Sequence, residues 1–273
     1  MKMQFSVLLS VYKNEKPEYL RLALQSVAQQ TLQADEIVIV KDGSLTQSLD
    51  SVIDKFAAKQ QNVRILSFTQ NRGLGLALRD GVTACTHEYI ARMDTDDIAL
   101  PERFARQMAY LERHENIALL GSWITEFSRD DEKPDTITKL PCTHKDILAY
   151  AKKRNPFRHM TMVFKKSAVI ASGNYRDFLW FEDYDLWVRM LQQGYKAANL
   201  PEVLVNVRAG EEMFARRGGW RYLKQELFFQ KYLQECSFIN IYQYIKNVSI
   251  RASMRIMPNF MRVVVYKNFL RSS

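Results

Sequence analysis

The chain has 273 residues, with 39 Lys and Arg against 30 Asp and Glu for a net charge of +9, and 47% of its residues are hydrophobic. This composition excludes disordered, collagen-like and low-complexity proteins, because so apolar a chain buries enough surface to fold. The three cysteines, Cys85, Cys142 and Cys236, lie too far apart for a CxxC metal or redox motif, which is typical of a reduced cytoplasmic protein. The apolar runs are too short for a membrane-spanning helix.

Short apolar runs alternate with segments of helical period through the first part of the chain. The opening run, Phe5 to Tyr12, imitates the apolar region of a signal peptide but lacks a small-residue cleavage site, so we interpret it as a strand. The elements predicted after it are a helix over 17–30, a strand over 37–40, a helix over 49–56, a strand over 63–68, a helix over 73–84, a strand over 89–93 and a helix over 101–114. Four strand–helix units in succession predict an α/β protein with a doubly wound, mostly parallel sheet.

The second half of the chain loses this regularity. We expect a strand over 117–127, a polar loop over 128–138, a helix over 146–153, a strand over 160–164 and a helix over 181–193 that ends at Gly194. From Arg208 onward the chain carries 12 Lys or Arg and four Glu, which accounts for +8 of the net charge. We therefore divide the chain into a catalytic domain over 1–215, with a mixed second half, and a basic helical extension over 216–273.

Acidic residues follow two of the predicted strands. Ligands of doubly wound sheets bind outside the carboxyl ends of the strands, where Asp42, Asp94 and Asp96 lie. In an extended segment Asp94 and Asp96 point the same way and can converge on Mg²⁺ or Mn²⁺, which keeps positions free for phosphate oxygens. The alternative is a solvated acidic turn beside the helix that begins at Pro101, and Asp42 alone is equally consistent with a turn residue.

A second acidic cluster lies among aromatic residues between Trp180 and Trp187. Glu182, Asp183 and Asp185 suit the first turn of a helix, and Asp185 can pair with Arg189 four residues on, so a purely structural role is one interpretation. The functional interpretation is that the aromatic rings exclude water from a carboxylate, which raises its pKa and makes it a better proton acceptor.

Other catalytic motifs are missing or incomplete. The Asn71–Gly75 segment lacks the third glycine of a dinucleotide fingerprint, because position 78 is Leu, and the chain has no P-loop, HExxH or GxSxG motif. His159 is a lone histidine beside a predicted strand, which is more often structural, and we keep it as a candidate for substrate contact.

Taken in order, these segments resemble family 2 glycosyltransferases of the GT-A fold, of the bacterial exopolysaccharide and O-antigen type. The resemblance runs from about Phe5 to Arg217 and depends on five motifs. They are Ser6 to Tyr12 with Asn14, Asp35 to Ser44, Asn71 to Gly73, the DxD element Met93 to Asp97, and the ED pair Glu182-Asp183. The resemblance implies an inverting, metal-dependent hexosyltransferase that uses a nucleoside diphosphate sugar, with uridine diphosphate expected.

The resemblance also implies roles for individual residues. Ser10, Tyr12, Asp42, Arg72 and Asp94 would bind the nucleotide, with Asp42 on the base and Asp94 on the ribose side. Asp96 would hold Mn²⁺ or Mg²⁺ on the diphosphate. Asp183 would be the catalytic base, with Glu182 beside it in the ED motif.

One departure from the family pattern concerns the diphosphate. Many members carry a histidine a few residues after a late arginine, whereas this chain has Arg208-Ala209-Gly210 at that place. Arg216 and Arg217 are the candidates to supply positive charge to the leaving group, and the alternative for both is surface charge.

The extension after Gly218 is predicted to be helical and amphipathic. Met254, Met257, Met261 and Val264 recur at helical spacing beside Arg251, Arg255 and Arg262. Such a face suits an anionic membrane surface, so we expect a cytoplasmic protein bound to the inner face of the membrane, with a saccharide or lipid-linked saccharide as acceptor. The alternatives are that these helices pack on the catalytic domain or on a second subunit.

Two other functions would also use these features. The net charge raises the possibility of a nucleic-acid-binding protein, but no matching motif accompanies it and we expect no nucleic acid partner. A non-catalytic relative that only binds nucleotide sugars is the other alternative, against which the intact DxD and ED motifs argue.

Overall fold

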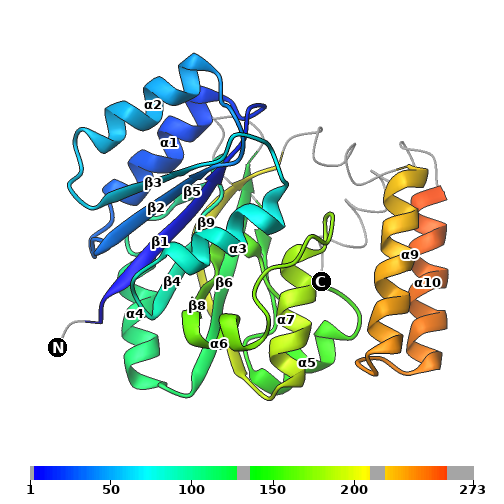
Figure 1. Cartoon of the computed structure of the whole chain (residues 1–273). Coiled ribbons are helices and arrows are strands. Elements are labelled where there is room, and N and C mark those ends of the chain that lie inside the picture. The colour runs from blue at the N-terminus through cyan, green and yellow to red at the C-terminus, as the bar shows by residue number, and fades with distance from the viewer. Residues whose placement is uncertain (1–2, 128–135, 210–218, 257–273) are drawn as a thin grey trace.

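A computed structural model describes residues 3–127, 136–209 and 219–256. Within them the strands form one curved, nine-stranded sheet (Figure 1), of order β3-β2-β1-β4-β8-β6-β9-β5 with β7 paired to β6. The strands are β1 (Phe5–Val11), β2 (Glu36–Lys41), β3 (Val63–Ser67), β4 (Tyr89–Arg92), β5 (Ile98–Ala99), β6 (Ile117–Phe127), β7 (Thr136–Thr138), β8 (Val163–Lys165) and β9 (Lys196–Arg208).

The pairing directions divide this sheet into a parallel half and a mixed half. β1 pairs in parallel with β2 and β4, and β2 with β3, whereas β8 runs antiparallel to both β4 and β6. β9 then pairs in parallel with β6 and antiparallel with β5. The predicted doubly wound, mostly parallel sheet with a mixed second half is confirmed, and the carboxyl ends of β1, β2 and β4 lie at one edge.

Helices cover both faces of the sheet. The helices are α1 (Pro17–Ala28), α2 (Gln47–Ala57), α3 (Leu74–Ala84), α4 (Arg103–Arg113), α5 (His144–Ala151), the 3₁₀ turn η1 (His159–Thr161), α6 (Lys166–Ala171), α7 (Glu182–Gln192), α9 (Trp220–Glu235) and α10 (Ile241–Ile256). Alternate residues of β1 enter opposite layers: Val7 and Leu9 pack with α1, α2 and α4, whereas Leu8 packs with α3 and α7. The sheet is therefore packed between two hydrophobic layers, which hold its strands, and the loops that follow them, in place.

Several elements of the second half differ from the sequence-based expectation. The predicted loop over 128–138 is partly wrong, because Thr136–Thr138 form β7 against β6, while 128–135 lie outside the described residues. The predicted strand over 160–164 is displaced, since η1 precedes β8. The strands β5 and β9 and the helix α6 were not predicted.

The C-terminal helices α9 and α10 form a hairpin (Figure 1), and aromatic side chains of α9 pack against the start of α7. Phe229 of α9 stacks on Phe181 with ring centroids 4.6 Å apart, and Phe181 immediately precedes α7. The buried Glu226 of α9 pairs with Arg251 of α10, whose guanidinium also donates to the Lys153 carbonyl. The predicted helices of the extension are thus present, and α9 packs directly behind the start of α7. The last predicted helix, after Pro258, lies outside the described residues.

Candidate active site

The sheet brings the acidic residues of two strands to one edge. The register pairs Val11 with Lys41 and Leu8 with Arg92, so the residues that follow β1, β2 and β4 lie side by side. Ser10 and Tyr12 therefore neighbour Asp42 and the DxD segment, as expected. Tyr12 is exposed there, which leaves its ring accessible to a ligand.

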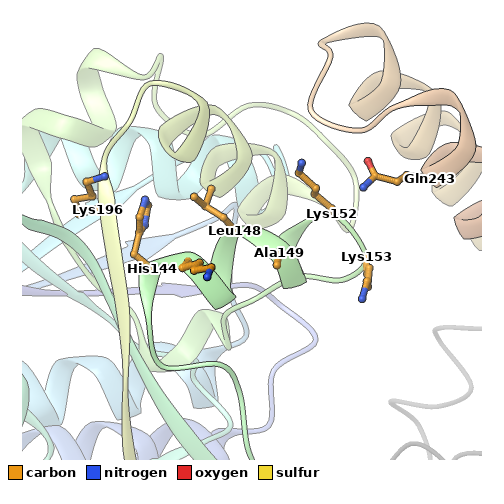
Figure 2. Close-up of a pocket in the computed structure, with 8 residues that line it drawn as sticks. His144, Leu148, Ala149, Lys152, Lys153, Lys196 and Gln243 are labelled. Carbon is orange, nitrogen blue, oxygen red and sulfur yellow. The ribbon is translucent and has the colours of Figure 1, made fainter.

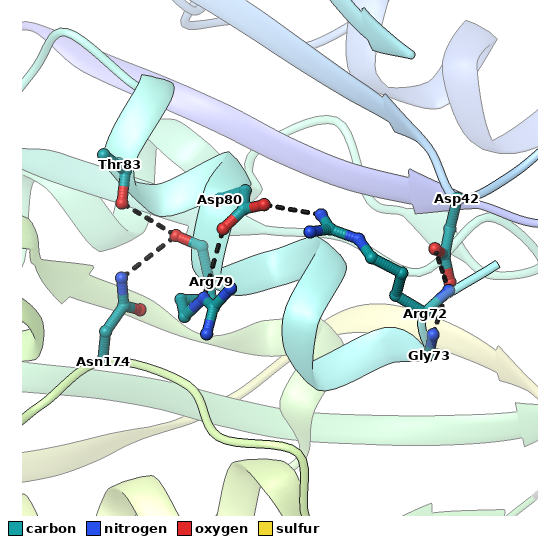
Figure 3. Close-up of polar contacts among 7 residues, drawn as sticks. All are labelled: Asp42, Arg72, Gly73, Arg79, Asp80, Thr83 and Asn174. Atoms are coloured by element: carbon teal, nitrogen blue, oxygen red, sulfur yellow. Dashed lines mark hydrogen bonds and ion pairs between the residues drawn. The ribbon is translucent and has the colours of Figure 1, made fainter. Parts of the chain in front are cut away.

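Asp42 organises the loop that precedes α3. Its carboxylate accepts hydrogen bonds from the backbone N–H groups of Arg72 and Gly73 at 2.8 and 3.0 Å (Figure 3). Gly43 follows at a φ of +87°, and a Cβ there would lie 2.6 Å from the Asn71 nitrogen, so a side chain has no room. Asp42 is thus a buried anchor for the loop, and each of its oxygens keeps a lone pair for another donor.

Arg72 points along α3. Its guanidinium forms an ion pair with Asp80 at 2.5 Å and lies 3.9 Å from the centre of the Phe68 ring. Figure 3 shows the Arg72 side chain reaching from the loop before α3 to Asp80, which also contacts Arg79. The expected nucleotide contact of Arg72 is therefore not preformed, because Asp80 on the next turns of α3 holds the guanidinium.

The DxD segment is held by Arg92, which directly precedes it, and by partners from two distant parts of the chain. Arg92 pairs with Asp94, the Thr95 hydroxyl donates to Glu15 at 2.6 Å, and the buried Asp97 accepts the Arg208 backbone N–H at 2.8 Å. Burial raises the pKa of Asp96 to about 7, with further contributions from the neighbouring carboxylates of Asp94 and Glu15. The segment thus concentrates negative charge that its own contacts do not fully offset.

This charge distribution fits a divalent cation. Burial, and then the neighbouring carboxylates of Asp94 and Glu15, raise the pKa of Asp96, and a bound cation would relieve the repulsive part of that rise. Within the described residues no group of three His, Cys, Asp or Glu side chains has metal-site geometry. Mg²⁺ and Mn²⁺ sites that use one or two carboxylates and take their remaining oxygens from a diphosphate need no such group.

The ED pair begins α7. Asp183 is half-buried; one of its oxygens accepts from the Asn155 amide at 2.7 Å and the other from the Tyr184 N–H at 2.6 Å. Burial raises the pKa of Asp183, and the two hydrogen bonds oppose that rise. Burial and the adjacent Asp183 raise the pKa of Glu182 to about 8. The two donors favour the charged form of Asp183, as a proton acceptor requires.

Arg92 connects the two acidic clusters. Its side chain is 1% exposed, and its positive charge acts on Asp94, Glu182 and Asp183 together. The buried Arg103 fixes the strand here by donating to the Arg92 carbonyl at 2.6 Å. One buried guanidinium, which the sequence analysis had not singled out, therefore pairs with the DxD segment and acts through its charge on the ED pair.

A tight backbone approach fixes the ED pair against α3. A Cβ on Gly75 would lie 2.2 Å from the Arg176 carbonyl oxygen and 3.2 Å from the Glu182 Cβ. Glycine is required here because the loop that leads into α7 passes directly over the first turn of α3. The Asn71–Gly75 segment thus supports the site by packing rather than as a dinucleotide fingerprint.

His159 lies in an aromatic cluster behind the ED pair. Its Nε2 is 2.9 Å from the Tyr175 hydroxyl, and its ring meets Trp187 edge to face at 6.1 Å. Burial, and then the charge of Arg92, lower the pKa of His159 well below its usual value, so the ring is neutral. These contacts favour the structural interpretation, and its contact with substrate stays a prediction.

The late arginine reaches the DxD segment. The Arg208 Nε donates to the Asp96 carbonyl at 3.2 Å, and its guanidinium lies 3.7 Å from the centre of the Tyr19 ring. Arg208 therefore ties the end of β9 to the DxD segment. Arg216 and Arg217, the candidates for the leaving-group contact, lie outside the described residues.

A separate pocket lies at the opposite end of the sheet. Lys196 begins β9 where β6 also begins, and β6 runs in the same direction as β4. The pocket has a volume of about 640 Å³ (Figure 2). Its lining is mostly basic and consists of His144, Lys145, Leu148, Ala149, Lys152, Lys153, Lys196 and Gln243. None of the acidic site residues contributes to it.

The mixed α/β sheet, with carboxylates gathered where its parallel strands end, has the architecture of the GT-A class of glycosyltransferases. The family model "Glycosyl transferase family 2" matches residues 6–171, and the chain belongs to this family. The amylovoran biosynthesis glycosyltransferase AmsE of Erwinia amylovora is 44% identical over 257 residues, which cover 93% of this chain and 94% of AmsE. An Escherichia coli UDP-Gal:alpha-D-GlcNAc-diphosphoundecaprenol beta-1,3-galactosyltransferase is 34% identical over 268 residues, 98% of this chain and 97% of that enzyme.

Solved glycosyltransferases share the fold. The mannosyltransferase PcManGT of Pyrobaculum calidifontis, in complex with GDP-Man and Mn²⁺, has a TM-score of 0.66 at 14% identity, over 98% of this chain and 74% of that one. S. aureus TarS 1-349 in complex with UDP-GlcNAc also has a TM-score of 0.66, at 17% identity, over 99% of this chain and 76% of that one. The expected GT-A fold is thus confirmed.

Proposed function

We propose that this chain is an inverting glycosyltransferase that moves a sugar from a uridine diphosphate donor to a hydroxyl group of a saccharide or lipid-linked saccharide. The observation that carries the proposal is the placement of both acidic segments where the strands of the parallel half end. The DxD segment follows β4 there, and the ED pair lies against the first turn of α3, whose preceding loop Asp42 holds. One cluster suits the diphosphate of a donor, and the other offers a base for an acceptor.

Asp183 is the proposed catalytic base. Its carboxylate takes the proton of the acceptor hydroxyl while that oxygen bonds to the anomeric carbon of the donor sugar. The bond from that carbon to the diphosphate oxygen breaks, and the configuration inverts. General-base assistance typically contributes about 10² to 10⁴ in rate. Burial raises the pKa of both carboxyl groups of the ED pair, and the hydrogen bonds from Asn155 and the Tyr184 N–H favour the charged form of Asp183.

On the donor side, Asp96 would hold Mn²⁺ or Mg²⁺, which when bound neutralises negative charge on a diphosphate leaving group, and Asp94 would contact the ribose side of the nucleotide. Ser10, the exposed Tyr12 and Asp42 would bind the nucleoside, and Tyr12 offers a ring for stacking on the base. The UDP-sugars in the names of the Escherichia coli relative and of the TarS complex support a uridine donor.

Two measurements test the reaction. A thermal-shift panel of nucleotide sugars with Mn²⁺ or Mg²⁺ identifies the donor, because a ligand at 100 times its dissociation constant stabilises by about 2.7 kcal/mol. NMR of the product formed from the donor so identified then gives the anomeric configuration. Inversion is expected, and retention of configuration would refute the role of Asp183 as base in a single displacement.

We also propose that the hairpin of α9 and α10 contacts the inner face of the cytoplasmic membrane. Its exposed apolar side chains support this; they are Trp220, Phe228, Ile241, Tyr242, Ile245 and Ile250. The diphosphoundecaprenol substrate named for the Escherichia coli relative is a lipid, which supports a lipid-linked acceptor here. No helix among the described residues is long and apolar enough to cross a bilayer.

Flotation with anionic liposomes tests the membrane proposal. The full chain is expected to float, and a chain truncated after Ile250 is expected to float less because it lacks the basic residues that follow. Equal behaviour of the two would count against a role for that segment. The side chains of Met254 and Arg255, and all of residues 257–273, lie outside the description, so this amphipathic face is argued from sequence.

A further inference from the structure

The turn that leads into the ED pair contains an unfavourable backbone conformation. The Phe181 N–H donates to the Phe178 carbonyl at 2.9 Å and closes a four-residue turn. Trp180, the third residue of this turn, has a φ of +67°. This left-handed conformation favours glycine, and a bulky aromatic residue rarely adopts it. Such strain concentrates at functional sites.

Core packing does not explain the tryptophan. The next residue, Phe181, is 6% exposed and stacks on Phe229, so it anchors the turn to α9. Trp180 itself is 36% exposed. A glycine at this position would satisfy the backbone, and Phe181 would still hold the turn in place.

The indole of Trp180 is nevertheless held in one orientation. Tyr222 of α9 lies against it, with ring centroids 5.0 Å apart and ring planes 30° apart. The Arg221 guanidinium lies 5.9 Å from the centre of the same ring. Trp180 therefore presents a supported aromatic surface to solvent rather than a freely rotating side chain.

This surface is close to the proposed base. Trp180 precedes Asp183 by three residues, so their Cα atoms are at most about 11 Å apart. The residues proposed to bind the nucleoside follow β1 and β2, whereas Trp180 is fixed by α9 at the start of α7. The ring thus belongs to the α7 side of the site, where the acceptor must approach Asp183.

We propose that Trp180, supported by Tyr222, is the platform on which the sugar ring of the acceptor stacks. The inference deepens the proposed function and rests on it. Sugar rings have apolar faces of C–H groups that pack on an aromatic surface, while their hydroxyl groups remain free for polar contacts. A flat, oriented ring suits such a ligand, whereas a flexible lipid chain needs only apolar area.

Three substitutions at position 180 separate this role from a structural one. Trp180→Gly removes the ring and relieves the backbone, so the melting temperature should not fall while the acceptor KM rises about ten-fold. Trp180→Leu keeps an apolar side chain without an aromatic face, and its acceptor KM should rise similarly. Trp180→Phe should restore most of the affinity. Ile170→Ala, which removes an apolar side chain 44% exposed on α6, is the control and should leave KM unchanged.

The assay uses the full chain with two acceptors, one carrying a long lipid chain and the other the same saccharide on a short water-soluble group. The inference expects the same rise in KM on both, with the dissociation constant of the donor unchanged. An unchanged KM, a rise confined to the lipid acceptor, or full affinity in Trp180→Leu would overturn it. Failure of the wild-type chain to transfer sugar from any donor would instead overturn the proposed function.

Discussion

The hydrogen bond from Asn155 to Asp183 gives a quantitative prediction about the proposed base. The amide donates to the carboxylate at 2.7 Å and opposes the rise in pKa that burial causes. A hydrogen bond to a charged group contributes about 1.5–3 kcal/mol, and about 1.4 kcal/mol corresponds to one pKa unit. Because the site is half-open, water replaces part of the lost bond in Asn155→Ala, and we expect the pKa of Asp183 to rise by about one unit.

The sign of the effect on catalysis follows from the role of a base. Asp183 must be ionised to accept a proton, so activity is lost as pH falls through its pKa. In Asn155→Ala the acid limb of the pH profile of kcat/KM should move about one unit to higher pH. Much of the activity should return well above the new pKa.

A second asparagine supplies the control for this experiment. Asn247 of α10 donates to the Lys152 carbonyl, close in sequence to Asn155, and has no hydrogen bond to Asp183 among the described contacts. Asn247→Ala should therefore leave the acid limb in place even if it loosens the segment. An unmoved limb in Asn155→Ala, with activity lower by the same factor at every pH, would refute the reasoning.

Three further predictions concern the surroundings of the base. Arg92→Met removes a buried cation, so the free energy of unfolding at pH 7.5 should fall by about 3 kcal/mol. The loss should be smaller at pH 5.5, because more of the neighbouring carboxylates are protonated there. Urea titrations that give the same loss at both pH values would contradict this prediction. Gly75→Ala places a Cβ 2.2 Å from the Arg176 carbonyl oxygen, so the rate of sugar transfer should fall at least ten-fold. In the control Gly73→Ala the new Cβ meets no atom within 4 Å, so this variant measures the cost of a positive φ alone. Equal transfer rates in the two variants would contradict the packing argument. The pKa of Glu182 rises from 4.5 to about 8 on folding, so the native state binds a proton that the unfolded state has released, and the stability should fall as pH rises between these values. Glu182→Gln should reduce this dependence of the melting temperature on pH in thermal scans. An unchanged pH dependence would contradict the raised pKa.

The regular half of the fold was predictable because local signals agree with the tertiary structure there. Apolar runs such as residues 37–40 are buried on both faces and alternate with amphipathic helices, which requires parallel pairing. The same rule placed Asp42, Asp94 and Asp96 at one edge of the sheet. The ED pair was found because acids among aromatic residues are unusual in sequence.

The mixed half was harder because its strands depend on distant partners. β9 contains Pro201, which argues against a strand in sequence. The ladder with β6 accommodates it by a register shift between the pairs Ser122–Leu200 and Trp123–Val203, so that Pro201 needs no partner. β5 has two residues and no periodicity to detect.

The site residues that were missed are likewise defined by tertiary contacts. Arg92 precedes the DxD motif, and a charged residue at the end of a buried strand was a signal that could have identified it. Asn155 is 28 positions from Asp183, and no local pattern connects them. The sequence analysis predicted a nucleotide contact for Arg72 and did not predict its ion pair with Asp80, because these two residues are eight positions apart and meet only once α3 has formed.

The most direct test of the central claim separates binding from transfer at Asp183. The chain and its Asp183→Asn variant would be compared by calorimetric titration with the donor and Mn²⁺, and by transfer to a saccharide acceptor. The variant keeps the shape of the side chain and loses the base. We expect an unchanged dissociation constant for the donor together with loss of transfer. Transfer at the wild-type rate by the folded variant, or loss of donor binding, would contradict the assignment of Asp183 as the catalytic base.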